Sequence, residues 1–164
     1  MTGRTHAACG AFLGALAGAA FGSPEAGAVT GAVAALLPDL DHPGSTIGRR
    51  VPVIPVLLEA VAGHRTVTHT VWFCLALAAG FGFLGSWLAG FGVPGVKGFF
   101  LALPALAGSL SHLALDSCTR SGVEPLAPFL PWHPKGPIIT GSFPDYLLAF
   151  GFALLAVGAV VKLG

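Results

Sequence analysis

The chain has 164 residues, of which 54% are apolar and only 9% are charged. A soluble domain carries roughly a quarter charged residues, so this composition indicates a protein surrounded by lipid. A net charge of +1 without a basic tract gives no indication of nucleic-acid binding, and three widely spaced cysteines argue against a disulfide framework or a thiolate zinc site.

The N-terminal part of the chain predicts a helical hairpin. Glycine recurs at every fourth position from Gly10 to Gly22, and Gly27 and Gly31 repeat this spacing in the next segment. Such faces of small residues let two helices approach closely. They also argue against a cleaved signal peptide, so we expect this segment to be retained. The glycine faces suit packing within one chain or between chains, which leaves a homo-oligomer open.

Apolar runs separated by short polar segments predict an all-α fold, a polytopic transmembrane bundle of about five helices in a single domain over residues 1–164. Three runs approach the about 20 residues that a spanning helix needs, and the second is short. Residues 51–62 fit either a short interfacial helix or a loop. The segment from Ser142 to Asp145 resembles a capping box with proline in the first turn. The predicted helices are 5–21, 26–37, 66–90, 97–116 and 143–162.

Alternate crossings by these helices place six lysines and arginines on the side of the N-terminus and two on the other side. The positive-inside rule then predicts a multi-pass protein of the inner (cytoplasmic) membrane with its N-terminus in the cytoplasm. The N-terminal side carries Arg4, Arg49, Arg50, Arg65, Arg120 and Lys135, and the opposite side carries Lys97 and Lys162.

Histidines and aspartates from four segments fall on the same predicted side. His112 and Asp116 are four residues apart on one helix, so their side chains share a face. Neutral imidazole nitrogen and carboxylate oxygen together suit zinc, manganese or iron, and several carboxylates can bridge a pair of ions. We therefore predict a divalent metal site, zinc favoured, with one or two ions. The predicted ligands are His6, Asp39, Asp41, His69, His112 and Asp116.

Each of these residues also has a simpler explanation. The two aspartates of Pro-Asp-Leu-Asp-His-Pro-Gly can bond backbone amides in a turn, and His112 with Asp116 can form a hydrogen-bonded pair. His133 is better explained as an interfacial residue and Asp145 as a helix cap. Ionisable groups near a membrane interior are costly and usually functional, so their shared location favours a site.

Three motifs follow an N-terminal Thr-His in order: Pro-Asp-Leu-Asp-His, His-Arg-x-x-Thr-His and His-Leu-x-x-Asp-x-x-Thr-x-x-Gly. As an ordered set they resemble the YdjM-type inner-membrane proteins. Thr66 and Val67 stand where that family often has glycine, which is a small departure. The resemblance covers nearly the whole chain and implies a membrane-bound metal-dependent hydrolase, without implying a substrate.

The arginines beside these motifs favour an anionic substrate. Arg65 lies near two candidate ligands and its guanidinium fits a phosphate or carboxylate. A site at the bilayer surface favours a membrane lipid, so we expect hydrolysis of a phosphoester on a lipid or polyprenyl substrate by a metal-activated water. An ester or amide substrate stays open. His64 and His42 fit either a ligand or a proton donor, and the predicted catalytic residues are His64, Arg65 and His42.

The main alternative is a metal-ion transporter or a metal-sensing membrane protein. Transport requires polar groups that continue across the membrane, and the third and fifth predicted helices offer almost none in their middles. A third interpretation is a purely structural clamp of four helix ends. Such a clamp is coordinatively closed, whereas a hydrolytic metal needs an open position for water.

Overall fold

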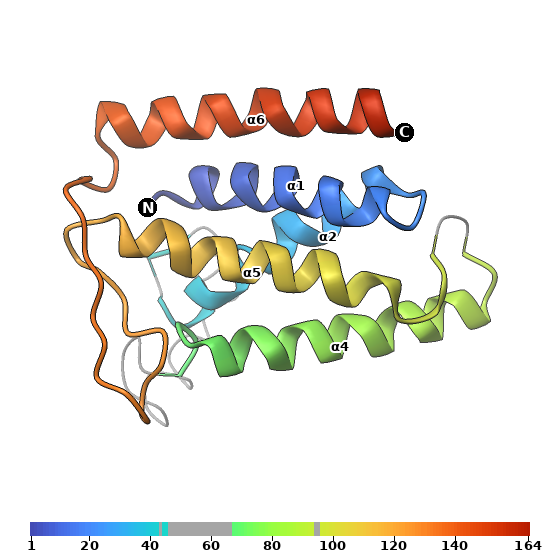
Figure 1. The fold of residues 1–164 in the computed structure, drawn as a ribbon, viewed down its shortest axis with the longest axis horizontal. Helices are drawn as coiled ribbons and strands as arrows, with labels where there is room; N and C mark the ends of the chain where they lie inside the picture. The colour runs from blue at the N-terminus through green and yellow to red at the C-terminus, as the bar shows by residue number, and fades with distance from the viewer. Residues whose placement is uncertain (43, 46–66, 94–95) are drawn as a thin grey trace.

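The computed structural model describes residues 1–42, 44–45, 67–93 and 96–164. In these ranges the chain forms five α-helices and two short 3-10 helices, which confirms the all-α prediction (Figure 1). The predicted segment 51–62 lies outside the described residues. The elements are α1 (Gly3–Ala19), α2 (Pro24–Ala34), η1 (Leu37–Asp41), α4 (Val71–Gly90), η2 (Gly98–Leu101), α5 (Ala102–Ser117) and α6 (Phe143–Leu163).

Among the described residues, three segments are long and apolar enough to cross a membrane: α4, the continuous stretch Gly98–Ser117, and α6. The apolar window of Gly98–Ser117 is 56% buried, against 22% for α4 and 6% for α6. This difference makes α5 the central helix, and Figure 1 shows it between α4 and the pair of α1 and α2. α4 and α6 leave large side chains such as Phe83 and Val157 exposed, as helices that face lipid do.

The glycine faces of α1 and α2 pack against each other within one chain. A Cβ atom added at Gly31 would lie 2.8 Å from the Cα of Gly14 and would overlap the carbonyl of Gly10. On the other side of α2, a Cβ added at Gly108 would lie 2.8 Å from the Cα of Gly31. Three helices therefore meet at Gly31 with almost no side-chain volume between their backbones.

α4 begins later than the sequence predicted, at Val71 and not at Thr66. Thr70 is its N-cap, and its hydroxyl oxygen accepts a hydrogen bond from the amide of Phe73 at 3.3 Å. The same hydroxyl donates to the carbonyl of Val67 at 2.8 Å, which holds the preceding residues in a turn. The apolar run begins only at Val71, after Thr68, His69 and Thr70, so the predicted start at Thr66 included polar residues that precede the helix.

α6 begins at Phe143 as predicted, but the expected capping box does not form. Ser142 is the N-cap residue, yet its side chain makes no capping hydrogen bond. Asp145 does not bond to the amide of Ser142, as that motif requires, because its Oδ2 accepts from the amide of Gly141, one residue earlier, at 2.8 Å. Its remaining bonds go to Thr2 and Thr5, so Asp145 fastens α6 to the start of α1.

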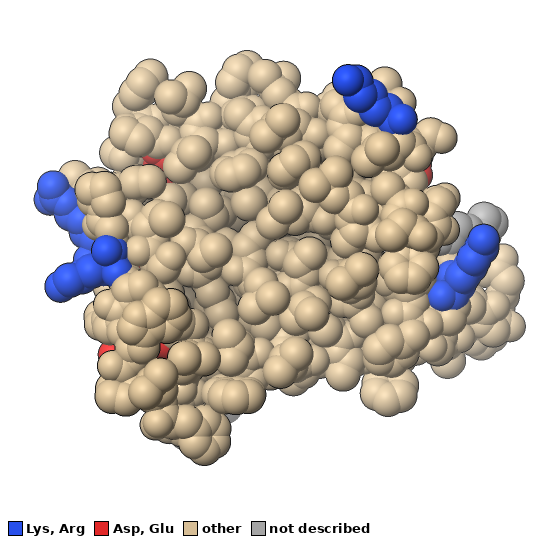
Figure 2. All heavy atoms as spheres, viewed as in Figure 1, with Lys and Arg blue, Asp and Glu red and all other residues tan. Residues whose placement is uncertain are grey.

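One end of the bundle collects the N-terminus, the end of α2 with η1, the start of α4, the end of α5 and the start of α6 (Figure 1). Lysine and arginine side chains lie toward the two ends in the view of Figure 2, with an uncharged surface between them. Among the described residues, Arg4, Arg120 and Lys135 belong to the segments at the first end, and Lys97 and Lys162 to those at the other. Arg49, Arg50 and Arg65 lie outside the described residues.

Candidate metal centre

Histidines and aspartates from four elements meet at the end of the bundle that holds the N-terminus. His6 comes from the first turns of α1, Asp39 from η1, His69 from the turn before α4, and His112 with Asp116 from the last turns of α5. They form two groups that share His112, and the ligand atoms within each group lie within 4.8 Å of one another. The groups are His6, Asp39 and His112, and His69, His112 and Asp116.

The His112 imidazole is fully buried and held in one orientation by a backbone carbonyl. Its Nδ1 lies 2.8 Å from the carbonyl oxygen of Ala35, the residue that ends α2. A carbonyl only accepts hydrogen bonds, so Nδ1 carries the proton and Nε2 of the neutral ring presents a lone pair. The close contact of Gly31 with Gly108, one turn earlier on both helices, brings this carbonyl within reach.

The His69 imidazole is also held through its Nδ1 atom, in this case by a hydroxyl group. Thr68 Oγ1 donates to Asp41 Oδ2 at 2.8 Å and lies 3.0 Å from Nδ1 of His69. A threonine hydroxyl has one proton, and it goes to Asp41, so Nδ1 of His69 must donate in the second contact. The Nε2 atom of His69 therefore also presents a lone pair.

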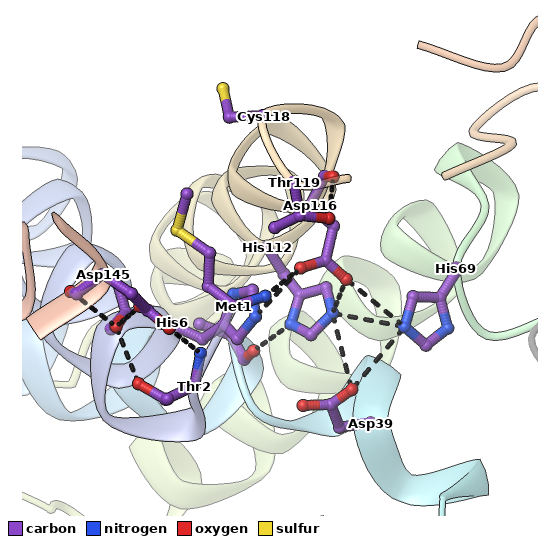
Figure 3. A network of polar contacts seen from close by, with 12 residues as sticks. Met1, Thr2, His6, Asp39, His69, His112, Asp116, Cys118, Thr119 and Asp145 are labelled. Carbon is purple, nitrogen blue, oxygen red and sulfur yellow. Dashed lines mark hydrogen bonds and ion pairs between the residues drawn. The ribbon is translucent and has the colours of Figure 1, made fainter. Parts of the chain in front are cut away.

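The Nε2 atoms of His69 and His112 face each other (Figure 3). These atoms lie 3.3 Å apart, and while both rings are neutral with Nδ1 protonated, neither can donate to the other. Asp39 and Asp116 lie on either side of this pair, with carboxylate oxygens 3.4–3.8 Å from the nitrogens. Four ligands held tetrahedrally by zinc lie about 3.3 Å from one another, given bonds of roughly 2.0–2.1 Å, so this donor set fits a divalent ion.

Asp116 uses its two oxygens differently. Oδ2 faces His69 and His112, whereas Oδ1 lies 2.5 Å from the amino group of Met1 and 3.2 Å from Nε2 of His6. His6 is fully buried and stacks on His112 with ring centroids 3.8 Å apart, but neither of its ring nitrogens has hydrogen-bond geometry to a described partner. An unsatisfied buried imidazole beside a carboxylate is a further indication that this cluster accommodates a cation.

Asp39 lies outside the spanning segments and is ionised at neutral pH. Burial alone would raise the pKa of its carboxyl group, but the neighbouring imidazoles of His69, His112 and His6, in their protonated forms, outweigh burial and lower that pKa. Its side chain is 18% exposed, more than the other groups of the cluster. Asp39 is thus the member that most directly meets solvent.

A cavity of about 380 Å³ reaches the cluster from the end of the bundle. Asp39 and Asp116 form part of its wall, and so does the N-terminal residue Met1. Most other lining groups are polar, which suits water and a hydrophilic headgroup. They are Thr2, Gly3, His42, Gly44, Ser45, Thr119, Ser121 and Thr140.

The remaining predicted residues take different places. His42, a predicted catalytic residue, lines the cavity, whereas His64 and Arg65 lie outside the described residues. Asp41, a predicted ligand, belongs to neither group of ligand atoms and lies behind His69, bonded to Thr68. His133 is exposed and its Nε2 lies 3.0 Å from the carbonyl of Ser121, away from both groups.

Two contacts that shape the centre were not predicted from the sequence. Thr68 stands within the His-Arg-x-x-Thr-His motif, so its position next to His69 was an available signal. The carbonyl of Ala35 offered no signal, because a backbone acceptor is independent of residue type. Only the packing of α2 on α5 brings it to His112.

Comparison with known proteins places the chain in a family. The family model described as "YdjM inner membrane protein" matches residues 1–163. The chain is 33% identical over 160 residues to the Bacillus subtilis (strain 168) protein YvsG, described as uncharacterized, covering 94% of this chain and 91% of that protein. It is 34% identical over 129 residues to the inner membrane protein YdjM of Escherichia coli (strain K12), covering 76% of this chain and 60% of that protein.

The inner membrane protein YdjM of Shigella flexneri matches over the same length with the same identity. No solved structure matches the chain. The names of these two relatives as inner membrane proteins agree with the three membrane-length helices in the part of this chain that the structure describes. The chain belongs to the YdjM family of inner membrane proteins.

Proposed function

We propose that this protein is a membrane-bound metal-dependent hydrolase. Asp39, His69, His112 and Asp116 would hold a divalent ion, zinc favoured over manganese or iron, and His6 beside Asp116 would complete the ligand set or help hold a second ion. The observation that carries this proposal is the pair of Nε2 atoms, 3.3 Å apart, whose other ring nitrogens are both committed as donors. A cation between them removes the repulsion of the two lone pairs.

The cavity supports an enzyme over a closed structural clamp. When bound, a divalent ion supplies a water that ionises near neutral pH. Asp39 and Asp116 lie in the cavity wall, so water and substrate reach the cluster. His42 lines the same cavity and is placed to give a proton to a leaving group there. Asp39, Asp116 and His42 thus line a cavity that gives water and substrate the access a hydrolytic centre needs.

The substrate class we favour is a phosphoester on a lipid or polyprenyl headgroup. The cavity is polar and lies at the end of a bundle whose helices are long enough to span a membrane. Arg4 and Arg120 belong to this end and favour an anionic group. Carboxylic ester and amide substrates are the competing possibilities, since an activated water also attacks carbonyls.

A transporter fits the described helices less well. The sequence of α4 from Val71 to Gly90 contains no charged residue, and α6 carries Asp145 and Lys162 only near its ends. A translocation path requires polar groups through the membrane interior. A cluster confined to one end of the bundle favours an enzyme, with a metal sensor as the second reading. We also propose that the cluster and the N-terminus face the cytoplasm.

The test is elemental analysis of detergent-purified protein after loading with zinc, manganese or iron. We expect wild type to retain a stoichiometric ion, His112→Ala to lose it, and His133→Ala to behave as wild type, because His133 is an exposed histidine outside the cluster. Absence of metal in loaded wild type, or equal metal in His112→Ala, would overturn the proposed site.

The reaction class is tested on the metal-loaded protein. Release of phosphate or headgroup from phosphatidic acid and phosphatidylglycerol in mixed micelles is compared with hydrolysis of a carboxylic ester lipid at equal concentration. Phosphoester cleavage that is lost in His112→Ala supports the proposal. Metal-dependent cleavage of the carboxylic ester alone would move the enzyme to the carboxylesterase class, and binding without either activity would favour a sensor.

A further inference from the structure

We propose that Thr68 and Asp41 are positioning residues that hold the His69 imidazole with its Nε2 atom facing the centre. Asp41 then acts through Thr68 and His69, behind the ligand set, and not as a ligand itself. The inference rests on the proposed function insofar as His69 is a metal ligand, but the orientation of the ring can be measured without a metal.

The contact geometry forms a directed chain. Thr68 Oγ1 donates to Asp41 Oδ2 at 2.8 Å and accepts from His69 Nδ1 at 3.0 Å. All three residues are buried, with 4% of Thr68, 2% of Asp41 and 2% of His69 exposed. The distance from His69 Nδ1 to Asp41 Oδ2 is 3.9 Å, too long for a direct hydrogen bond. Asp41 therefore affects the orientation of the His69 ring only through its hydrogen bond with the Thr68 hydroxyl.

The short helix η1 has an aspartate on each side of the His69 ring. Asp39 places Oδ1 3.6 Å from Nε2, and Asp41 lies beyond Thr68 on the Nδ1 side. In a 3-10 helix, residues two positions apart point about 120° away from each other, so one cannot replace the other. η1 thus supplies one candidate ligand and, through its second aspartate, the group that orients another.

His69 needs this support because no helix fixes it. It precedes α4, whose first residue is Val71, and lies in a turn with Thr68 and Thr70. His112 lies inside α5 and uses the carbonyl of Ala35 for the same purpose. Outer partners of this kind fix the tautomer of a ligating histidine and increase the basicity of the other nitrogen.

The experiment compares the same substitution at two neighbouring threonines. Thr68→Val removes the hydroxyl that bonds to His69, whereas Thr70→Val removes an equally buried hydroxyl that caps α4. The tautomer of His69 is read from nitrogen NMR of metal-free protein labelled at histidine, and zinc affinity is read by competition with a chelator. Thr68→Ser, which keeps the hydroxyl, is the rescue variant.

We expect Nδ1-protonated His69 in wild type, a mixture of tautomers in Thr68→Val, and recovery in Thr68→Ser. Zinc affinity should fall about 10–100-fold in Thr68→Val, the loss typical of an outer-shell partner, and fall by less in Thr70→Val, which weakens the turn and the start of α4 but leaves the bond between Thr68 and His69 in place. Nε2-protonated His69 in wild type, or a Thr68→Val protein with unchanged tautomer and affinity, would overturn the inference. Wild type that binds no metal but keeps the Nδ1 proton would refute the proposed function and leave the orienting role of Thr68 in place.

Discussion

Asp145 fastens the first turn of α6 to the first turn of α1, the helix that carries His6. The carboxylate is fully buried and accepts hydrogen bonds from the amides of Thr2 and Gly141, at 3.0 and 2.8 Å, and from the hydroxyl of Thr5. Because these donors come from both chain segments, one carboxylate satisfies the start of two helices. The neighbouring Ser142 stands at the N-cap position but makes no capping bond.

This arrangement predicts that Asp145 contributes much to the free energy of unfolding and that Ser142 contributes little. Asp145→Ala removes the acceptor of three hydrogen bonds, one buried and two part-buried, and should lower the free energy of unfolding by about 2 kcal/mol. Ser142→Ala should change it by less than about 0.5 kcal/mol, although a serine in that position normally caps a helix. The measurement is thermal or denaturant unfolding in detergent. A larger loss for Ser142→Ala than for Asp145→Ala would show that the capping box operates after all.

For single residues, the sequence predicted which side chains come together but not which of their atoms contact one another. His6, Asp39, His69, His112 and Asp116 come together because each lies at a helix end on the same side of the bundle, which apolar periodicity is enough to indicate. The separate roles of two aspartates in η1 depend on the helix type there. Both aspartates were predicted as ligands, whereas the 3-10 helix directs their side chains apart.

Glycine packing sets the spacing of the helices that carry the site. Gly31 touches α1 at Gly10 and Gly14 and touches α5 at Gly108. Its carbonyl accepts from the amide of Ala35 at 2.9 Å, so the turn that contains Gly31 also places the carbonyl that orients His112. Small residues at this contact therefore serve both the stability of the bundle and the geometry of the site.

Gly31→Ala should destabilise the protein, whereas Gly151→Ala should not. The added methyl at Gly31 would overlap backbone atoms, which cannot rotate away, and overpacking of this kind costs about 1–3 kcal/mol or more. Nothing lies within 4 Å of a Cβ added at Gly151 in α6, so alanine there should be neutral or stabilise by about 0.5–1 kcal/mol. Unfolding in detergent measures both variants. Zinc affinity should fall with Gly31→Ala alone, and equal stability of the two variants would contradict the close packing.

The helices themselves could be predicted well from the sequence, and their exact ends less well. Long apolar runs have few alternatives in a membrane, because backbone groups in lipid must bond within the segment. The start of α6 at Phe143 was predicted, whereas the start of α4 depends on Thr70, a single side chain whose partners Val67 and Phe73 lie on either side of it. Those partners become visible only once the chain is folded. The sequence also left undecided whether the glycine faces pack within one chain or between two chains, since small residues suit both kinds of contact.

At the scale of the whole molecule, the two ends of the bundle differ in chemistry. The end that holds the N-terminus carries the histidine and aspartate cluster, the polar cavity, and Arg4, Arg120 and Lys135. The other end of the described structure carries Lys97 and Lys162. Together with Arg49, Arg50 and Arg65 of the full sequence, this distribution favours a cytoplasmic location for the cluster.

Two reporters at opposite ends of the molecule test this orientation. Cys118 is a free, exposed cysteine just after α5, at the end with the cluster, while Cys9 and Cys74 are buried. In intact spheroplasts we expect a membrane-impermeant maleimide to leave Cys118 unlabelled and to label it after permeabilisation. In a Cys118→Ser background, Lys162→Cys near the far end of α6 should be labelled in intact spheroplasts, because α6 is long enough to cross the membrane. The reverse pattern would place the cluster outside the cytoplasm and restrict its substrates to the opposite leaflet, whereas labelling of both sites in intact spheroplasts would contradict a membrane-spanning α6.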